Sequence, residues 1–408
     1  MTVDRRGFVA RAASLAAAAA VGTPGAVRAL EAPPDHPSRH GSEQPRARGD
    51  DPLGVRGDFP IVANHIYLNS AYIAPIPRPV VAAGQAFIQA KAERSITVGE
   101  MLAKANEVRG QFARLINAAP AEVGLLMATT EGENVLANTL PMEPGDNIVV
   151  DDLHYEGALI VHRQAEKRRG VELRVAKHRD GVVTTDDIAT LIDNRTRLVS
   201  VSLVSSLNGY RHDALALADV AHAHGAHLHL DAIQALGMFP FDVRATDVDS
   251  LCSGTYKWLL GGFGIAPFYM KGTALERTVP DRFGGFAGAG GRRYDYATLP
   301  FAEVWQLGAA LTYLEKVGVA RLEEHALGLS RRLKEGLLKQ GYLLFQPVEN
   351  RTSIVTFRYV RPMADLEQAF SAANIAATIR AGHVRLSVSL FNNTDDVDQL
   401  LTVTSRLS

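Results

Sequence analysis

The sequence predicts an α/β fold with a large domain built on a mainly parallel sheet and a smaller α+β domain after it. Seven short apolar runs alternate with segments of helical periodicity between residues 123 and 270. This alternation is typical of parallel strands joined by helical crossovers. The runs lie at residues 123–128, 147–150, 171–176, 196–204, 227–231, 249–253 and 265–270. Beyond residue 307 long helical patterns are followed by separated strand-like runs, which predicts the second domain.

The predicted helices of the large domain begin with apolar periodicity from residue 80 to about 117, interrupted near residues 97–99. Before it, residues 67–72 read as a short strand and turn. Thr129 and Thr130 open a helix that reaches about residue 140. Further helices are predicted over residues 157–169, closed by Gly170, and over residues 213–225, with Asp213 as the N-cap.

Polar side chains follow several of these strands. Ligands of parallel α/β sheets bind where the strands' carboxyl ends meet. We therefore expect one shared site to contain Thr130, Tyr155, Ser206, Asp231 and Ser253.

The domain boundary is expected near residue 307. The large domain is predicted to cover residues 59–306, with its first residues packing on the small domain, which covers residues 307–408. In the small domain we predict helices over residues 307–317, 318–340, 363–373 and 394–405, and strands over 352–358 and 383–389. Length and period distinguish these helices from the strands.

The N-terminal segment resembles an export signal. Residues 4–9, Asp-Arg-Arg-Gly-Phe-Val, form a twin-arginine pattern, an alanine-rich run follows at residues 12–21, and residues 27–29 offer a small-residue cleavage site. We predict a twin-arginine signal peptide at residues 1–29 and a disordered linker at residues 30–58. A basic amphipathic leader or a misassigned start is the alternative. The expectation is a periplasmic or secreted protein, exported folded by the twin-arginine machinery and without stable membrane association after cleavage.

Composition excludes several other classes. The chain has 408 residues, is 47% hydrophobic and 21% charged, and carries a formal net charge of -1. This balance is typical of a soluble globular protein and gives no reason to expect a nucleic-acid partner. Cys252 is the one cysteine, which excludes an internal disulfide framework and a multi-cysteine metal site.

Asp231 and Lys257 suit one particular chemistry. Asp231 ends an apolar run, and Lys257 follows the next run closely, in the segment Ser-Gly-Thr-Tyr-Lys. A lysine amine can hold pyridoxal 5′-phosphate (PLP) as a Schiff base, and a carboxylate can pair with the protonated ring nitrogen. A surface lysine is the alternative for Lys257. Thr129 and Thr130 could form an anion-binding site at a helix N-terminus. The alternative is that they are an ordinary helix N-cap.

With these residues in their order, the chain from about residue 67 to 401 resembles the class V aminotransferase group of fold-type I PLP enzymes. That group includes cysteine desulfurases, selenocysteine lyases, kynureninases and isopenicillin N epimerases. The resemblance implies a PLP-dependent homodimer with a seven-stranded sheet. It assigns Lys257 as the covalent anchor and catalytic residue, Asp231 as the ring-nitrogen partner and Gln234 as the partner of the ring's phenolic oxygen.

The remaining cofactor contacts also follow from the resemblance. Thr129 and Thr130 at the helix N-terminus, with Ser253 and Tyr256, are expected to hold the phosphate. Tyr155 is expected to stack on the cofactor, although a slip of one residue would exchange it with His154. Ser206 replaces a ring-contacting asparagine of the desulfurases, so Asn208 is assigned to that contact. Thr298 is expected to reach the neighbouring subunit's phosphate, with a surface turn as the alternative.

For the substrate, the resemblance assigns a carboxylate-binding arginine to Arg385, in the segment Arg-Ala-Gly-His-Val-Arg-Leu-Ser at residues 380–387. An arginine fork grips a carboxylate through two parallel hydrogen bonds, and a structural salt bridge is the alternative. Ala71 and Tyr72 are assigned to the same substrate side. The expected substrate is a small amino acid or an amino-acid-derived compound.

One departure narrows the expected reaction. Persulfide-forming desulfurases carry a cysteine on a loop before the carboxylate arginine, and residues 375–385 contain none. We therefore expect an aminotransferase, lyase or epimerase and not a persulfide-forming desulfurase.

Two alternatives from other classes stay open. His227, His229 and Asp231 share one strand face and could bind zinc, as in a periplasmic zinc-binding protein or metallohydrolase. A PLP-fold binding protein without turnover is the other. Our assignment contains no metal.

Overall fold

The computed structural model describes residues 49–380 and 382–407. The predicted signal peptide and most of the predicted linker lie outside the described residues. Of the helices in the described part of the chain, none is long and apolar enough to cross a membrane.

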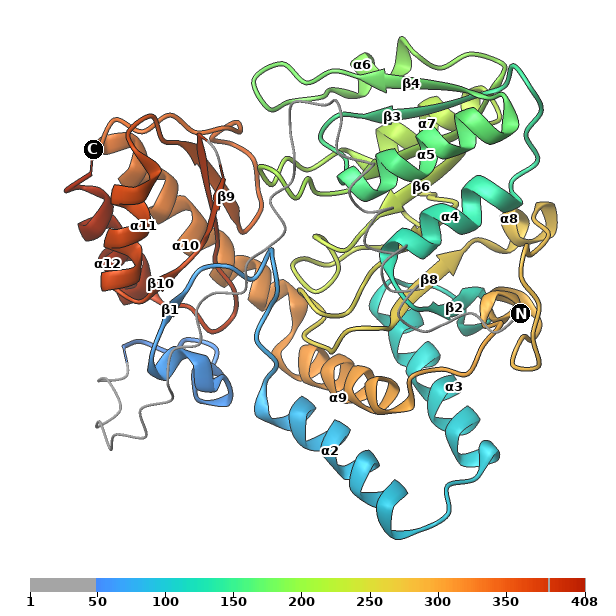
Figure 1. Ribbon diagram of the computed structural model, residues 1–408, viewed down its shortest axis with the longest axis horizontal. Helices are drawn as coiled ribbons and strands as arrows, with labels where there is room; N and C mark the ends of the chain where they lie inside the picture. The colour runs from blue at the N-terminus through green and yellow to red at the C-terminus, as the bar shows by residue number, and fades with distance from the viewer. Residues whose placement is uncertain (1–48, 381, 408) are drawn as a thin grey trace, which may run out of the picture. The chain divides into compact units, whose positions relative to one another are not determined.

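A seven-stranded sheet forms the centre of the large domain, in the order β2-β8-β7-β6-β5-β3-β4 (Figure 1). Five strands, from β4 to β7 along this order, pair in parallel, and β8 is antiparallel to both of its neighbours. The predicted α/β class with a mainly parallel sheet is confirmed. The strands are β2 (Val123–Leu126), β3 (Asn147–Asp151), β4 (Glu172–Ala176), β5 (Thr196–Ser202), β6 (His227–Asp231), β7 (Ser250–Cys252) and β8 (Ala266–Met270).

The register of the central strands aligns their carboxyl ends. Ser202 on β5 pairs with Asp231 on β6, and Asp231 pairs with Cys252 on β7. Every residue of β6, β7 and β8 is buried, as expected for strands covered on both faces. Because β5, β6 and β7 are parallel and in register, the segments that follow these three strands begin at one edge of the sheet.

Capping residues set where two of the crossover helices begin or end. Asp213 accepts a hydrogen bond from the Ala216 N–H, and so caps α7, and Gly170 ends α5 with a φ of 70°, which favours glycine. The helices and short 3-10 turns of this domain are α4 (Thr129–Thr139), α5 (Glu156–Arg169), α6 (Thr185–Ala189), α7 (Ala214–Ala223), α8 (Gly272–Arg277), η3 (Pro120–Glu122) and η4 (Gly290–Tyr294).

Three helices pack beside one edge of this domain. α2 (Arg78–Glu93) and α3 (Val98–Leu115) both contact α9 (Phe301–Val317), and Figure 1 shows the three together. The break between α2 and α3 falls at the predicted interruption, where the Thr97 hydroxyl accepts the Glu100 N–H and caps α3.

The small domain contains a three-stranded antiparallel sheet, in the order β11-β12-β9, packed on long helices. The short strand β1 (Ile66–Tyr67) runs parallel to β10 (Ile375–Ala376) beside this sheet, so a segment before the large domain's sheet packs on the small domain. The other elements are α10 (Val319–Lys339), β9 (Ile354–Arg358), α11 (Met363–Ala372), β11 (Thr378–Arg380), β12 (His383–Ser387) and α12 (Thr394–Thr404).

The last ten residues of the predicted linker have a defined structure. They include η1 (Arg56–Asp58), and η2 (Pro60–Ala63) follows. The Arg56 guanidinium donates to both carboxylate oxygens of Asp396, at 2.8 and 3.0 Å, and to the Phe391 carbonyl at 2.6 Å. This paired geometry holds the segment against the small domain, so the linker prediction is too long at its C-terminal end.

Candidate active site

Lys257 and Asp231 are the two buried charged groups at the centre of the site. Lys257, 8% exposed, lies in the loop after β7, and Asp231, 3% exposed, ends β6. Burial lowers the pKa of Lys257 to about 8, while the charge of Asp231 acts in the opposite direction. Burial raises the pKa of Asp231, and Lys257 and His154 oppose that rise. Asp231 pairs with Cys252, the last residue of β7, so amine and carboxylate both belong to segments at the carboxyl edge of neighbouring strands.

The N-terminus of α4 forms one wall of the site. Its N-cap is Ala128, whose side chain accepts no hydrogen bond, so the first N–H groups of the helix carry no side-chain cap. The Thr129 hydroxyl accepts the Gly254 N–H at 2.8 Å and thereby ties this turn to the segment before Lys257. Thr130 is half-buried beside it. Backbone N–H groups and hydroxyls at a helix start suit a phosphate.

The segment from Ser253 to Tyr256 lies against this turn. Ser253 is fully buried, and its hydroxyl donates to the Gly254 carbonyl at 3.3 Å. A side-chain carbon on Gly254 would lie 3.1 Å from the Thr129 hydroxyl and 3.2 Å from the Tyr256 ring, so glycine allows this close approach. The Tyr256 ring stacks on Phe263 with centroids 4.6 Å apart, and burial raises its pKa to about 12.

His154 and Tyr155 occupy opposite environments. The His154 ring is 2% exposed and contacts the Ser202 and Ser200 hydroxyls at 2.8 and 3.2 Å. The Tyr155 side chain is 49% exposed. Its ring and the Thr130 hydroxyl would both contact a side-chain carbon on Gly157, at 2.6 and 3.5 Å. Of the two rings, that of Tyr155 is the one free to stack on a ligand beside α4.

The side-chain amides of Gln234 and Asn208 form hydrogen bonds with other groups of the protein. Gln234 accepts the Trp258 indole N–H at 2.8 Å and donates to the Ala71 carbonyl at 2.9 Å, which leaves one amide hydrogen for a ligand. Asn208 is fully buried and makes three backbone contacts, with the Gly181 carbonyl, the Phe345 carbonyl and the Tyr210 N–H. In the structure Asn208 therefore connects three backbone segments by hydrogen bonds. This differs from the predicted contact with the cofactor ring.

Arg385 lies in a cavity of about 170 Å³ between β12 and the segment after β5. Its guanidinium donates to the Ser206 carbonyl and, at 3.0 Å, to the Thr378 hydroxyl. Burial lowers the pKa of Arg385 to about 10, and the neighbouring Arg380 contributes to that shift. Arg380 and His383 also line the cavity. The sequence reasoning missed Arg380, although it begins the motif that contains Arg385.

Two residues, 381 and 382, separate β11 from β12, and Gly382 has a φ of 77°. A connection this short requires a tight turn and leaves no room for a long loop over the cavity. The substrate end of the site is therefore bounded by β11 and β12 themselves.

The remaining assigned residues lie as follows. Ala71 is fully buried, and its N–H donates to the Ser387 hydroxyl at 2.8 Å. Tyr72 is 39% exposed, and its phenol acts on the titration of Tyr256 and Arg385. Thr298 is exposed, and its role at a subunit interface stays a prediction.

The zinc site proposed on β6 does not assemble. His227 Nε2 and His229 Nδ1 both contact the Ser250 hydroxyl, at 2.7 and 2.9 Å, and Asp231 accepts the Ile233 N–H instead. Among the described residues, the group whose ligand atoms could hold a metal is Glu133, His154 and His162. Sequence reasoning missed it because its members come from separate elements.

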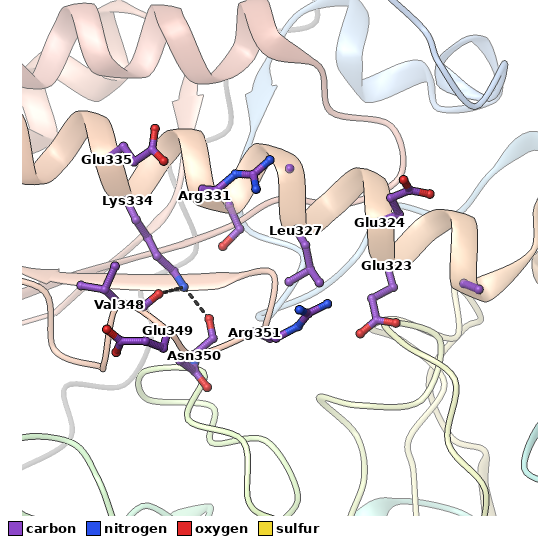
Figure 2. A pocket seen from close by; sticks show the side chains of 13 residues that line it. Glu323, Glu324, Leu327, Arg331, Lys334, Glu335, Val348, Glu349, Asn350 and Arg351 are labelled. Atoms are coloured by element: carbon purple, nitrogen blue, oxygen red, sulfur yellow. Dashed lines mark hydrogen bonds between the residues drawn. The ribbon is translucent and has the colours of Figure 1, made fainter.

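A cavity of about 560 Å³ lies elsewhere, between α10 and the loop at residues 348–351 (Figure 2). Its buried cation, Lys334, donates to the Val348 carbonyl at 3.0 Å and also to the Asn350 carbonyl. Carbonyls of the protein thus satisfy this amine, and none of the assigned cofactor or substrate residues lines the cavity.

Known proteins resemble this chain over nearly their whole length. It is 29% identical to a cysteine desulfurase of Klebsiella pneumoniae subsp. pneumoniae over 396 residues, covering 86% of this chain and 97% of the relative. The apo structure of cysteine desulfurase from Thermococcus onnurineus NA1 matches with a TM-score of 0.81 and 24% identity, over 88% of this chain and 99% of that one. The cystine C–S lyase C-DES, solved with its reaction product cysteine persulfide, matches with a TM-score of 0.81 and 20% identity, over 85% and 99%.

These relatives correct the expected reaction. We excluded a persulfide-forming desulfurase because residues 375–385 lack a cysteine, and that exclusion is wrong, since the matched proteins are cysteine desulfurases or yield a persulfide. The exclusion rested on one missing cysteine in one short segment, which does not outweigh a match over 97% of the length of a cysteine desulfurase. The comparisons do not favour a zinc protein or a scaffold without turnover either.

The family itself is shown by the match of residues 66–400 to the model described as Aminotransferase class-V. The family's cofactor is PLP. The residues present fit it, because a helix N-terminus without a side-chain cap is tied to the segment before the buried amine of Lys257, and the buried carboxylate of Asp231 ends the strand next to β7. The chain belongs to the class V aminotransferase family and is a PLP-dependent enzyme of the transferase and lyase type.

Proposed function

We propose that this protein is a cysteine desulfurase, which cleaves the bond between Cβ and sulfur in cysteine. The observation that carries the proposal is the Klebsiella desulfurase, which this chain matches over 97% of that protein's length. The balanced reaction is cysteine plus a thiol giving alanine plus the persulfide of that thiol. The Cβ–S bond breaks, a sulfur–sulfur bond forms on the acceptor, and the acceptor's proton offsets the one that alanine gains.

The roles of the chain's own residues follow from their positions. Arg385 would grip the substrate carboxylate, with its guanidinium oriented by the Ser206 carbonyl and the Thr378 hydroxyl. That grip fixes which bond of the amino-bearing carbon is aligned for cleavage. When bound, PLP supplies an electron sink for negative charge at that carbon. Lys257, with a pKa lowered to about 8, would accept and return the proton there, since such an amine exchanges protons near neutral pH.

The sulfur acceptor would come from a second molecule. Cys252 lies on β7, fully buried, and burial raises its thiol pKa well above the ordinary value, so it is a poor nucleophile. Cys252 is also the one cysteine in the sequence. We propose a small thiol, such as a second cysteine, as the acceptor that leaves with the sulfur.

The test is a product analysis with purified holoenzyme and L-cysteine, with and without added thiol. We expect alanine and sulfane sulfur in equal amounts, formed faster as thiol is added, and the same yield from Cys252→Ala. Ketoacid formation from ordinary amino acids without any sulfur product would overturn the proposal. Loss of sulfur transfer in a folded Cys252→Ala enzyme would contradict the proposal of an external thiol acceptor, but not the desulfurase activity itself.

Export and dimerisation are also proposals. The twin-arginine pattern at residues 4–9 supports export of the folded enzyme to the periplasm or beyond. Thr298 supports a homodimer in which this exposed residue reaches the partner's phosphate site. Fractionation of cells that carry Arg5→Lys and Arg6→Lys together tests export, and light scattering of the purified enzyme tests the dimer.

A further inference from the structure

A buried cluster lies beneath the cofactor site, and the proposed reaction does not use it. Glu133 projects from α4, His162 from α5 and His229 from β6, and His154 directly precedes Tyr155. None of the four side chains is more than 2% exposed. A carboxylate buried this deeply needs a compensating positive charge or full hydrogen bonding.

Three imidazole rings aim the same ring nitrogen at the Glu133 carboxylate. The Nε2 atom of His162 lies 2.9 Å from Oε2, and those of His154 and His229 lie 3.2 and 3.5 Å from Oε1. In a tetrahedral site with ligand distances of about 2.0–2.1 Å, neighbouring ligand atoms are roughly 3.3 Å apart. The ligand atoms of Glu133, His154 and His162 all lie within 4.8 Å of one another.

The opposite ring nitrogens of two histidines have partners suited to metal ligands. His154 Nδ1 lies 2.8 Å from the Ser202 hydroxyl, and His229 Nδ1 lies 2.9 Å from the Ser250 hydroxyl. A metal-bound histidine usually donates its other N–H to such an acceptor, which fixes the ring. In this structure the Tyr155 N–H donates to His154 Nδ1 at 2.9 Å; metal binding through Nε2 would place a proton on Nδ1, directed at Ser202, and leave the Tyr155 N–H with the Ser202 hydroxyl, 3.3 Å away.

Three atoms of the cluster have no hydrogen-bond partner among the described residues. They are His229 Nε2, Glu133 Oε1 and His162 Nδ1, the last on the ring edge that faces away from Glu133; all three belong to buried side chains. Three imidazole nitrogens and one carboxylate form a donor set that suits first-row divalent ions such as Zn²⁺.

We propose that Glu133, His154 and His162, whose ligand atoms lie within 4.8 Å of one another, bind one divalent transition-metal ion, with Zn²⁺ as the first candidate, and that His229, whose Nε2 lies 3.5 Å from Glu133 Oε1, moves in as the fourth ligand. The set closes the coordination sphere, so the ion is structural. It ties together α4, the segment before α5 and β6, which also carry Thr130, Tyr155 and Asp231. This site differs from the rejected one on β6 in three of its four ligands, and it stands independently of the proposed reaction.

The test measures the metal content of the purified holoenzyme, produced with and without added zinc and purified without chelators, because a fully buried site loads during folding. We expect about one zinc or other first-row divalent ion per chain, and anomalous scattering at the zinc edge beside Glu133 in crystals. Glu133→Gln and His162→Asn should each reduce the content at least tenfold, since each removes one ligand.

His222→Asn is the matched control. His222 is a half-exposed histidine that bonds Asp249 at 2.8 Å outside the cluster, so this variant should keep the metal and the activity. Wild-type enzyme without stoichiometric metal after zinc-supplemented production would overturn the proposal, as would Glu133→Gln enzyme with full metal content. In that case hydrogen bonds between the histidine rings and the Glu133 carboxylate, without a metal ion, would hold the cluster together. The wild-type measurement decides even if a variant fails to fold, and the visible absorption of bound PLP reports separately on the cofactor site.

Discussion

The two ends of the active site are built by different means. At the cofactor end, β6 ends at the carboxyl edge of the sheet, where α4 and the loop to Lys257 start, and the register there aligns Ser202, Asp231 and Cys252. At the substrate end, Arg385 stands on a short antiparallel hairpin of the small domain and reaches the large domain through the Ser206 carbonyl.

This difference suggests that the geometry of the cofactor end is fixed by the fold, whereas that of the substrate end can vary. Backbone hydrogen bonds of a buried parallel sheet hold the cofactor end, so its geometry follows from the fold. Hydrogen bonds of the Arg385 guanidinium to the Ser206 carbonyl and the Thr378 hydroxyl hold the substrate end. Substrate choice can therefore change on this hairpin while cofactor binding stays as it is.

The largest expected effect lies at the cofactor end. Lys257→Ala should abolish the visible absorption of covalently held PLP and lower kcat by more than about 10³-fold, because one amine both anchors the cofactor and moves the proton. Absorbance and steady-state kinetics on the same preparation measure both. Lys271→Ala, at the surface ion pair with Asp247, is the control and should change neither. A Lys257→Ala enzyme that keeps colour and activity would remove the basis of the site.

A substitution at the substrate end should lower activity without loss of the visible absorption of bound PLP. Arg385→Lys keeps the charge but loses the planar fork, so kcat/KM for cysteine should fall by about 10²-fold, the equivalent of roughly 2–3 kcal/mol. Cysteamine, which lacks the carboxylate, serves as the comparison and should lose little. If both substrates lose equally, Arg385 has a structural role instead of a carboxylate contact.

The pH dependence of cofactor capture sharpens the same comparison. The neutral amine attacks the aldehyde, and burial lowers the pKa of Lys257 to about 8. Capture of PLP by apoenzyme should therefore rise by about tenfold per pH unit below pH 8 and level off above it. Stopped-flow absorbance between pH 7 and 10 measures the rate. A rate that climbs steadily to pH 10 would indicate an ordinary lysine at this position.

The smallest effect is expected at Asn208, which lies between the two ends. Asn208→Ala removes three backbone hydrogen bonds, so the free energy of unfolding should fall by about 2–3 kcal/mol. Urea denaturation measures this loss, and PLP absorption should be retained. Unchanged stability with weakened PLP binding would instead support the ring contact that the resemblance assigned.

Much of the fold was predictable because local rules and the sheet agree. Asp213 caps α7 and Gly170 ends α5 as expected, and apolar runs located all seven strands. The linker boundary was not predictable, because the order of residues 49–58 depends on Arg56 reaching Asp396 at the far end of the chain. Periodicity also could not separate His154 from Tyr155, which differ by one residue but are 2% and 49% exposed.

The sequence by itself determined the strand order along the chain, the positions of Asp231 at the end of one strand and Lys257 after the next, and the family. It could do so because residues at the carboxyl ends of parallel strands meet at one edge whatever the details of packing. Only the tertiary structure decided that Asn208 fastens loops, that Arg380 stands beside Arg385, and that Glu133 collects three histidines. Those contacts join elements far apart in the chain, and packing in three dimensions, which no local pattern records, sets their distances.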